Sequence, residues 1–262
     1  MSANTHKTFT LITGASGGFG AEFAKLCAAD GRNLILVARR GDKLTQLAAE
    51  LGNDVAVHTI VQDLTEHGAA QKVYNRIRRL RLTVDQLINN AGSGDYAPFA
   101  KANPVRQESM ITLNITALTL LTNFLLPDMI KRGRGRILNV ASVVGFVPLP
   151  KMSVYGASKA YVLSFSEALS AELKGTGVTV TCLCPGAAKT GFSRAARLVS
   201  NHPIARTKVT PTSVASFGYD AMIAGLPVAV AGIKNQLFIE LTTRLLPRAL
   251  TRKLMLAYGT RA

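Results

Sequence analysis

Short apolar runs alternate with helix-like segments along most of the chain, and this alternation restricts the fold more than any other feature. Strands that are apolar on both faces and alternate with helices are typical of a parallel sheet covered on both sides. The pattern therefore predicts an α/β fold with a doubly wound parallel sheet and helices on both faces. We expect strands at Phe9–Thr13, Asn33–Ala38, Val55–Thr59, Gln86–Ile88, Arg136–Ala141, Val178–Leu183 and Val228–Ala231, and helices at Ala21–Asp30, Lys43–Leu51, Gly68–Leu80 and Val154–Leu173.

The chain has 262 residues, of which 48% are hydrophobic. This composition excludes a disordered chain, and the length suits one large domain with a substantial core. No linker or internal repeat divides the sequence, so we expect a single domain over residues 1–262. Two segments depart from the alternation: residues 189–211, which we expect to form a substrate loop, and residues 232–262, which we expect to form a helical tail.

Glycines gather directly after the first predicted strand, in the stretch TLITGASGGFG. In a doubly wound sheet, ligands bind at the carboxyl ends of the strands, and glycines let the backbone approach a diphosphate there. The helix that follows offers unpaired N–H groups and the positive end of its dipole. The alternative is a tight turn without a ligand. The stretch predicts a pyrophosphate cradle made of Gly14, Gly18 and Gly20, and we count Ser16 and Phe19 among the cofactor-binding residues as well.

The second predicted strand ends in Arg39 and Arg40. An acidic residue at this place would bind the ribose 2′-hydroxyl of NAD, whereas arginine suits a 2′-phosphate. Asp42 follows closely; it either neutralises an arginine or begins the next helix, and we favour the helix start. The sequence therefore predicts NADP(H) as the cofactor.

Tyr155 and Lys159 form the pattern YGASK within a predicted helix. Residues four apart lie on one helix face, so the Lys159 ammonium is expected beside the Tyr155 phenol, where it would lower the phenol pKa. Tyr155 would then act as general acid or base in the interconversion of a carbonyl and an alcohol. Ser142 follows the fifth predicted strand and would donate a hydrogen bond to the carbonyl oxygen. Alone, Tyr-x-x-x-Lys is a chance pattern, and Ser142 a cap or turn residue.

The spacing Thr-Gly-x-x-x-Gly-x-Gly, the turn Asn89–Gly92, and Asn114, Ser142, Tyr155 and Lys159 follow one another in a fixed order. In these motifs the sequence resembles the short-chain dehydrogenase/reductase family over nearly its whole length. Gly17 and Phe19 depart from the residues most frequent in that family. The resemblance implies a Rossmann-like oxidoreductase that forms a homodimer or homotetramer, with the helix of Tyr155 at a shared interface.

The resemblance also assigns roles to further residues. It implies that Asn90, Ala91 and Gly92 border the cofactor and that Asp63 meets its adenine. It implies that Asn114 holds a water that relays protons to Lys159. Pro185, Gly186 and Thr190 would contact the nicotinamide end. Read without the resemblance, these residues are ordinary turn, cap or core positions.

The substrate is expected to be a hydrophobic ketone, aldehyde or alcohol, because binding pockets are lined mostly by apolar groups. Loops at the same edge of the sheet carry apolar residues, although these could instead belong to the core or to an interface. The candidate segments are Ser93–Phe99, Val143–Met152 and the residues after Thr190. The candidate side chains are Val144, Phe146, Val147, Leu149, Met152 and Phe192.

The formal net charge is +16, which raises nucleic acid or an anionic membrane as partners. The basic clusters Arg76–Arg81 and Lys131–Arg136 lack interleaved aromatics, so we interpret them as solvated helix faces and expect no nucleic-acid partner. The tail after Lys234 alternates leucines with arginines at helical spacing, and Pro247 should break that helix. We favour a lid or partner contact for this tail over a membrane surface.

Cys27, Cys182 and Cys184 lie in apolar stretches and form no disulfide or metal-site pattern, so we expect reduced thiols and no bound metal. The N-terminal residues lack the apolar core of a signal peptide, and no apolar run approaches the ~20 residues of a membrane span. We expect a cytoplasmic protein. The alternative functions are a non-catalytic dinucleotide sensor on the same fold and a basic protein that binds membranes or nucleic acid.

Overall fold

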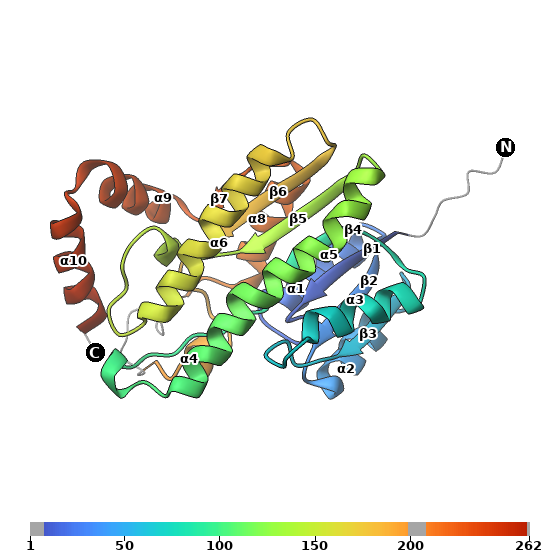
Figure 1. The fold of residues 1–262 in the computed structure, drawn as a ribbon, viewed down its shortest axis with the longest axis horizontal. Helices are drawn as coiled ribbons and strands as arrows, with labels where there is room; N and C mark the ends of the chain where they lie inside the picture. The colour runs from blue at the N-terminus through green and yellow to red at the C-terminus, as the bar shows by residue number, and fades with distance from the viewer. Residues whose placement is uncertain (1–7, 199–207, 261–262) are drawn as a thin grey trace.

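The computed structural model describes residues 8–198 and 208–260. Its centre is a parallel sheet with the strand order β3-β2-β1-β4-β5-β6-β7 (Figure 1). The predicted doubly wound sheet and all its predicted strands are confirmed, with shifts at their ends. The strands are β1 Thr8–Thr13, β2 Asn33–Ala38, β3 Val57–Val61, β4 Thr83–Asn89, β5 Gly135–Val140, β6 Val178–Cys184 and β7 Val228–Val230.

The strand order reverses at β1, which pairs with β2 on one side and with β4 on the other. Thr13, at the end of β1, pairs with Val37, and its neighbour Ile12 pairs with Ile88 of β4. The turns that follow β1 and β4 therefore leave the sheet side by side. Ligands of such sheets bind in the crevice at this reversal point, so the fold itself indicates where the site lies.

The helices include all four that the sequence predicts, each within two residues of its predicted bounds. The α-helices are α1 Phe19–Ala29, α2 Gly41–Leu51, α3 Ala69–Arg79, α4 Pro104–Ile111, α5 Leu118–Lys131, α6 Ser153–Glu172, α7 Phe192–Ala195, α8 Pro211–Ile223, α9 Ile233–Glu240 and α10 Arg248–Thr260. Short 3₁₀ turns are η1 Phe99–Lys101 and η3 Val143–Gly145, and π-helical turns are η2 Thr112–Ala117 and η4 Leu241–Leu245.

Helices cover both faces of the sheet, as expected for strands that are apolar on both sides. Successive residues of β1 point to opposite faces, so Ile12 packs in one apolar cluster and Leu11 in the other. The cluster of Ile12 includes Phe23 of α1, with residues of α2 and α8. The cluster of Leu11 includes Val73 of α3 and Leu121 of α5. Burial of these large side chains stabilises the layers by roughly 1.5–3 kcal/mol each.

The run Pro104–Lys131, which joins α4, η2 and α5, is long and apolar enough to cross a membrane by length and composition, because an 18-residue window within it has a mean hydropathy of 1.5. The sequence prediction that no segment reaches this length is therefore wrong on those two criteria. Core helices of soluble proteins also pass this test. In the structure, Leu121, Leu125 and Met129 of this run are buried in an apolar cluster against the sheet.

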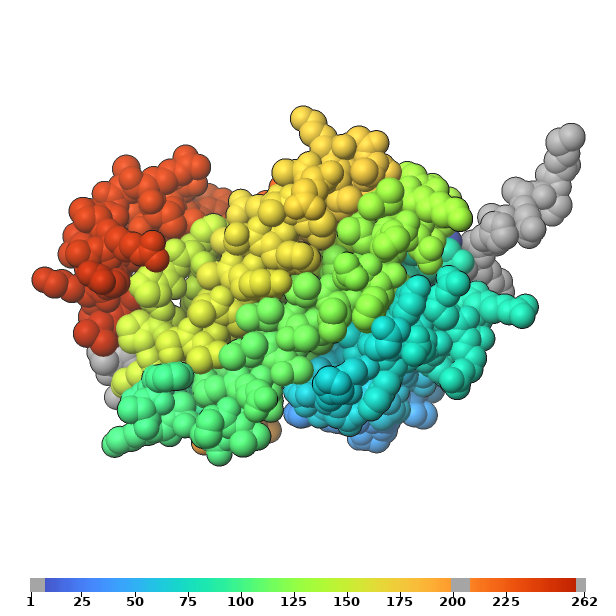
Figure 2. Space-filling view, viewed as in Figure 1, coloured from blue at the N-terminus to red at the C-terminus, as the bar shows by residue number. Residues whose placement is uncertain are grey.

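The C-terminal helices α9 and α10 form one end of the molecule, beside the connection from β5 to α6 (Figures 1 and 2). The helical path is broken at Leu246, whose φ and ψ of −95° and 133° are extended, and Pro247 follows. The predicted break at Pro247 is confirmed, since proline disfavours a helical residue before it. A hydrogen bond of 3.2 Å from the Thr251 hydroxyl to the Thr242 carbonyl ties α10 back to η4.

Candidate active site

The glycine turn after β1 has the backbone shape of a phosphate cradle. Gly14 and Gly18 have φ angles of +66° and +56°, where residues with a Cβ are strained. A methyl group on Gly20 would overlap the carbonyl oxygen of Gly14 and lie 2.6 Å from Asn90 Nδ2. Phe19 begins α1, so the unpaired N–H groups of that helix face the turn. This geometry fits the pyrophosphate of a dinucleotide.

The Asn90 turn after β4 is bound to the end of β1. The hydroxyl oxygen of Thr13 accepts hydrogen bonds from the backbone N–H groups of Asn90 and Ala91, both at 3.0 Å. In return, Asn90 Nδ2 donates to the Thr13 carbonyl at 2.9 Å. These bonds fix the two turns against each other at the reversal of strand order. Sequence reasoning missed Thr13; its one signal is a hydroxyl residue at the end of a buried strand.

Arg40 lies over the glycine turn. Its Nη2 donates to the Ser16 carbonyl oxygen at 2.8 Å and to the Ser16 hydroxyl at 3.0 Å. Arg39 reaches the other side of this corner, with Nη1 3.8 Å from Asp63 Oδ2. Asp42 lies in the first turn of α2, as the helix-start alternative predicts. Two guanidinium groups thus border the site at the end of β2.

Asp63 remains ionised at neutral pH. Partial burial alone would raise the pKa of its carboxyl, but hydrogen bonds from Thr65 and the charge of Arg39 outweigh that effect and lower the pKa. The bonds come from the Thr65 backbone N–H at 2.9 Å and the Thr65 hydroxyl at 2.8 Å. Asp63 therefore offsets part of the Arg39 charge and leaves the cation of Arg40 directly over the turn.

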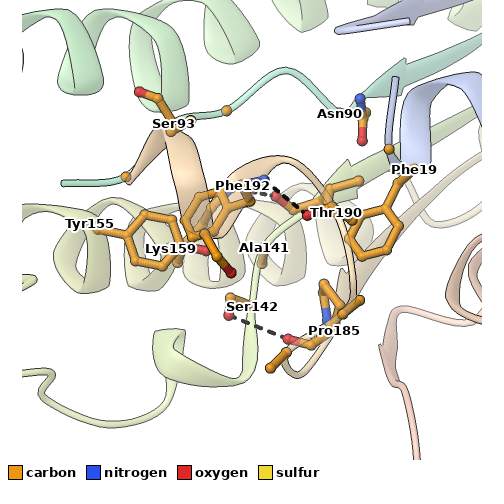
Figure 3. Close-up of a pocket in the computed structure, with 18 of the residues that line it drawn as sticks. Phe19, Asn90, Ser93, Ala141, Ser142, Tyr155, Lys159, Pro185, Thr190 and Phe192 are labelled. Carbon is orange, nitrogen blue, oxygen red and sulfur yellow. Dashed lines mark hydrogen bonds between the residues drawn. The ribbon is translucent and has the colours of Figure 1, made fainter. Parts of the chain in front are cut away.

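Ser142, Tyr155 and Lys159 meet beyond the end of β5 (Figure 3). The Ser142 hydroxyl lies near enough to the Tyr155 phenol to influence its pKa, and it donates to the Pro185 carbonyl at 3.3 Å. Lys159 is buried; its Nζ donates to the Val140 carbonyl at 2.8 Å and lies 5.8 Å from the centre of the Tyr155 ring. The structure thus brings together the phenol, the hydroxyl and the ammonium that the sequence predicts to act jointly.

The electrostatics of this group differ from the sequence prediction. Burial of its phenol raises the pKa of Tyr155 to about 12, and the nearby Ser142 hydroxyl only partly counters this. Burial likewise lowers the pKa of Lys159 to about 8. The prediction that Lys159 depresses the pKa of Tyr155 is therefore wrong here, because desolvation of both groups is the larger effect. Tyr155 carries its proton at neutral pH.

Asn114 lies in the π-helical turn η2 and is buried. Its Oδ1 accepts from the Ser93 backbone N–H at 2.9 Å, and its Nδ2 donates to the Ser93 carbonyl at 3.0 Å and to the Ser158 hydroxyl at 2.9 Å. The side chain therefore makes the core hydrogen bonds of the alternative reading. It also approaches Lys159: a methyl group on Gly92 would lie 3.3 Å from Asn114 Oδ1 and 3.4 Å from Lys159 Nζ. The predicted water relay stays a prediction.

The loop after β6 crosses the site from the other side. Thr190 faces the glycine turn, with its Cβ 3.6 Å from the place of a methyl group on Gly18. The Thr190 hydroxyl accepts from the Phe192 backbone N–H at 3.2 Å, and the Phe192 ring lies against Tyr155, with centroids 5.2 Å apart (Figure 3). Gly186 packs against the side chain of Asn235 from α9. The loop therefore joins the cofactor end of the site to the phenol.

One continuous pocket of about 1930 Å³ joins the glycine turn, the two arginines and the group of Ser142, Tyr155 and Lys159. Ligand pockets commonly measure ~300–1,000 Å³, so this one has room for a dinucleotide and a substrate together. Its substrate end includes the predicted residues Val144, Leu149, Met152 and Phe192, whereas residues 199–207 of the predicted substrate loop lie outside the described residues. Its outer wall includes Phe238, Leu254 and Met255 from the C-terminal helices, the tail for which the sequence favours a lid or partner contact, although no residue of that tail was predicted to line the pocket.

A buried acid, Asp95, fastens the substrate loop, and the sequence did not reveal it. Its carboxylate, 1% exposed, accepts from Arg106 Nε at 3.1 Å and from Arg197 Nη2 at 2.7 Å. Gln107 Nε2 donates to its second oxygen at 2.9 Å. Arg106 also donates to the Ala195 carbonyl at 3.1 Å, so α4 holds the segment that carries Phe192. The one sequence signal for this anchoring role is an aspartate within the glycine-containing loop that precedes apolar residues of the pocket.

Cys182 and Cys184 share one side of β6, as predicted, and their sulfurs lie 3.8 Å apart and buried. Within the described part of the chain, no cluster of three or more histidine, cysteine or acidic side chains could hold a metal ion.

Comparison with known proteins shows which proteins this chain is similar to. The family model of short chain dehydrogenases matches residues 8–199. Sulfoacetaldehyde reductase 2 of Chromohalobacter salexigens is 42% identical over 185 residues, which cover 70% of this chain and 73% of that protein. A short-chain dehydrogenase of Sphingobium yanoikuyae, solved with NADPH, has a TM-score of 0.80 at 35% identity and covers 86% of this chain and 88% of its own. A 7β-hydroxysteroid dehydrogenase structure has a TM-score of 0.85 at 25% identity over 97% and 99%.

The fold, the glycine cradle and these matches together show that the chain belongs to the short-chain dehydrogenase family. It is an oxidoreductase that acts on CH–OH groups with a nicotinamide dinucleotide.

Proposed function

We propose that this protein interconverts a hydrophobic carbonyl compound and its alcohol with NADP(H), and that Tyr155 transfers the proton. The observation that carries the proposal is the meeting of the Tyr155 phenol, the Ser142 hydroxyl and the Lys159 ammonium in one pocket with the glycine cradle. A dinucleotide sensor would need the cradle but not this proton-transfer group, so we favour an enzyme over a sensor.

The cofactor supplies hydride to the carbonyl carbon when it is bound. Tyr155 gives its proton to the carbonyl oxygen during reduction and takes it back during oxidation. Its raised pKa keeps it protonated at neutral pH, which suits the reductive direction. The Ser142 hydroxyl stabilises the negative charge that develops on the carbonyl oxygen. Lys159 holds a positive charge near the phenol. Asn114 hydrogen-bonds Ser158, which lies on α6 together with Tyr155 and Lys159, and so helps to position that helix.

The proposed cofactor contacts follow the pocket from the adenosine end to the nicotinamide end. Arg39, Arg40 and Asp63 surround the adenosine, and the glycine turn holds the pyrophosphate. The lining of the pocket supports each of these positions. Gly20 supports the cradle through its close packing on the Gly14 carbonyl. The full proposed set is Gly14, Ser16, Gly18, Phe19, Gly20, Arg39, Arg40, Asp63, Asn90, Ala91, Gly92, Tyr155, Lys159, Pro185, Gly186 and Thr190.

The test of this proposal is a titration of the purified protein with NADPH and with NADH, followed by nicotinamide fluorescence, and then a screen of apolar ketones and aldehydes for NADPH oxidation. We expect NADPH to bind more tightly and at least one apolar carbonyl to be reduced. Preference for NADH would overturn the choice of cofactor, and binding of neither by folded protein would overturn the oxidoreductase itself.

Removing the two guanidinium groups should lower NADPH affinity selectively. In Arg39→Ala/Arg40→Ala, the 2′-phosphate loses charge-assisted hydrogen bonds worth ~1.5–3 kcal/mol, so the Kd for NADPH should rise about 10- to 100-fold. The Kd for NADH should stay within about twofold, since it lacks that phosphate. Arg76→Ala/Arg79→Ala on α3 removes the same charge away from the pocket and serves as the matched control. Equal losses for both cofactors would show that the arginines only hold the turn.

The pH dependence of reduction should report Lys159. Its pKa of about 8 means that the ammonium is present below that pH and is lost above it, while Tyr155, with a pKa of about 12, keeps its proton. At saturating NADPH, kcat/KM for carbonyl reduction should be flat at neutral pH and decline above this value. Lys159→Arg should move the decline to higher pH, because a guanidinium keeps its charge. A decline at the same pH in both proteins would assign it to another group.

The substrate end supports an apolar carbonyl compound. Leu149, Met152 and Phe192 belong to one apolar cluster that also contacts Tyr155. The Phe192 ring lies against the Tyr155 ring, so an apolar group of the substrate would contact Phe192 beside the proton donor.

The proposal includes a homodimer or homotetramer formed through α6. On that helix Tyr161 is 37% exposed and stacks on Phe165, so the helix presents an aromatic surface that a second copy of the chain could cover.

A further inference from the structure

The path from α9 into η4 exposes a stripe of large apolar side chains. Ile233, Leu237, Leu241 and Leu245 follow one another at intervals of four residues, and their exposed fractions run from 45% to 74%. Side chains four apart lie along one side of a helix. The opposite side is held to the body of the protein by Ile239, which is buried. The stripe is therefore an ordered apolar surface that the fold leaves in water.

Helix α10 repeats this arrangement. Met255 is buried in the apolar cluster of Leu149 and Met152, and Thr251 is buried against η4. Leu250 and Leu254, again four apart, are 48% and 45% exposed. We call residues 233–257 the C-terminal arm. In both of its helices one side packs on the rest of the protein and another side exposes leucines to solvent.

Basic side chains accompany the leucines. Those in the C-terminal arm are all exposed, and its sequence contains one acidic residue, Glu240, which pairs with Arg244 at 2.9 Å. Large exposed apolar surfaces mark interaction sites, and the excess of positive charge limits what can cover this one. The basic residues are Lys234, Arg244, Arg248, Arg252 and Lys253.

We propose that the C-terminal arm docks the protein on an anionic lipid bilayer, with its leucines among the acyl chains and its cations at the headgroups. Such a surface satisfies both features at once. A second copy of the chain paired through the same surface would bring like charges together. A nucleic acid would leave the leucines in water.

The docked orientation would place the pocket at the lipid surface. Phe238 and Leu254 line the pocket, and both belong to the C-terminal arm. The arm, in red, forms one end of the molecule in Figure 2. This inference goes beyond the proposed function, because the binding of vesicles requires neither cofactor nor turnover.

Vesicle flotation with the full chain tests the proposal, using phosphatidylcholine alone and phosphatidylcholine mixed with phosphatidylglycerol. The wild type should float with the mixed vesicles and remain behind with the neutral ones. Leu237→Ser/Leu241→Ser and Arg248→Gln/Arg252→Gln should each lower the vesicle partition coefficient at least about tenfold. Arg76→Gln/Arg79→Gln on α3 removes two exposed cations from a helix face away from the arm and should float like the wild type.

Each outcome decides the proposal. Circular dichroism and thermal unfolding confirm that the variants are folded. Failure of folded wild-type protein to float, equal flotation with neutral vesicles, or unchanged flotation of both arm variants would overturn it. The proposal would also be overturned if the wild type is a dimer that does not float and Leu237→Ser/Leu241→Ser is a monomer. That result would make the stripe an interface between copies of the chain. Cofactor titration of the same samples reports the proposed function separately, so the two can fail independently.

Discussion

Replacing Tyr155 by phenylalanine is expected to lower kcat for carbonyl reduction by roughly 10²–10⁴-fold, because the substitution removes the proton donor of the reaction. The pocket should otherwise persist. The ring keeps its contact with Phe192. Ser142, beside the lost hydroxyl, keeps its hydrogen bond to the Pro185 carbonyl. NADPH affinity should therefore change by less than about threefold. Steady-state kinetics and fluorescence titration of the same preparation measure both quantities.

Tyr161→Phe is the matched control. Tyr161 lies on the same helix, and its hydroxyl bonds Thr119 at 3.0 Å outside the pocket. That variant should keep wild-type kcat and NADPH affinity. Wild-type turnover by Tyr155→Phe would refute the role of this phenol, whereas a loss of NADPH binding in parallel with kcat would mean that Tyr155 mainly holds the cofactor.

Gly20→Ala should nearly abolish cofactor binding, by about 100-fold or more, and destabilise the fold by ~1–3 kcal/mol. The added methyl group would overlap the Gly14 carbonyl oxygen, which is backbone. It would also crowd Asn90 Nδ2, which hydrogen bonds to the Thr13 and Gly14 carbonyls hold in place at 2.9 and 3.3 Å. The turn after β1 must therefore move away from the turn after β4. Denaturant unfolding gives the loss of stability, and NADPH titration of the folded variant gives the loss of affinity.

Gly17→Ala tests whether the position or simply the loss of a glycine matters. This residue is in the same turn, but its methyl group would meet only Arg40 Nη2, at 3.2 Å, and that side chain is exposed and can shift. We expect less than about 0.5 kcal/mol of destabilisation. Equal effects at the two positions would contradict the close-approach explanation.

The strands could be predicted because both faces of the sheet are buried and each strand is an apolar run. The ends of the strands were predicted less accurately, because polar residues at some ends are paired in the structure and break the apolar pattern. The fourth strand was predicted as Gln86–Ile88, yet β4 begins at Thr83, because Asp85 is accommodated by a salt bridge to Arg32 at 3.3 Å. The third strand was displaced by two residues; β3 is an edge strand whose Val61 is 61% exposed, so burial constrains its pattern weakly.

The site was predictable as far as its residues lie in local patterns. Tyr155 and Lys159 share a helix face whatever the tertiary structure, and glycine spacing encodes the turn after β1. Their pKa values were not predictable, because the depth of burial that governs them depends on residues such as Phe192, far along the chain. The ion pairs of Asp95 were missed, and the residues of α9 and α10 that line the pocket could not be named, for the same reason: contacts between distant segments leave no local pattern.

The reversal of strand order at β1 has a consequence for how this protein can diversify. The adenosine and pyrophosphate end is built from residues before position 93, whereas most of the apolar wall comes from segments after β5, including the C-terminal arm. The proposed contacts of the nicotinamide end, Pro185, Gly186 and Thr190, lie in the later stretch, so the two stretches meet near the Tyr155 phenol. Mutations in the apolar wall can alter which compound is accepted, or where it is taken up, while the glycine turn and the two arginines at the other end of the pocket stay unchanged.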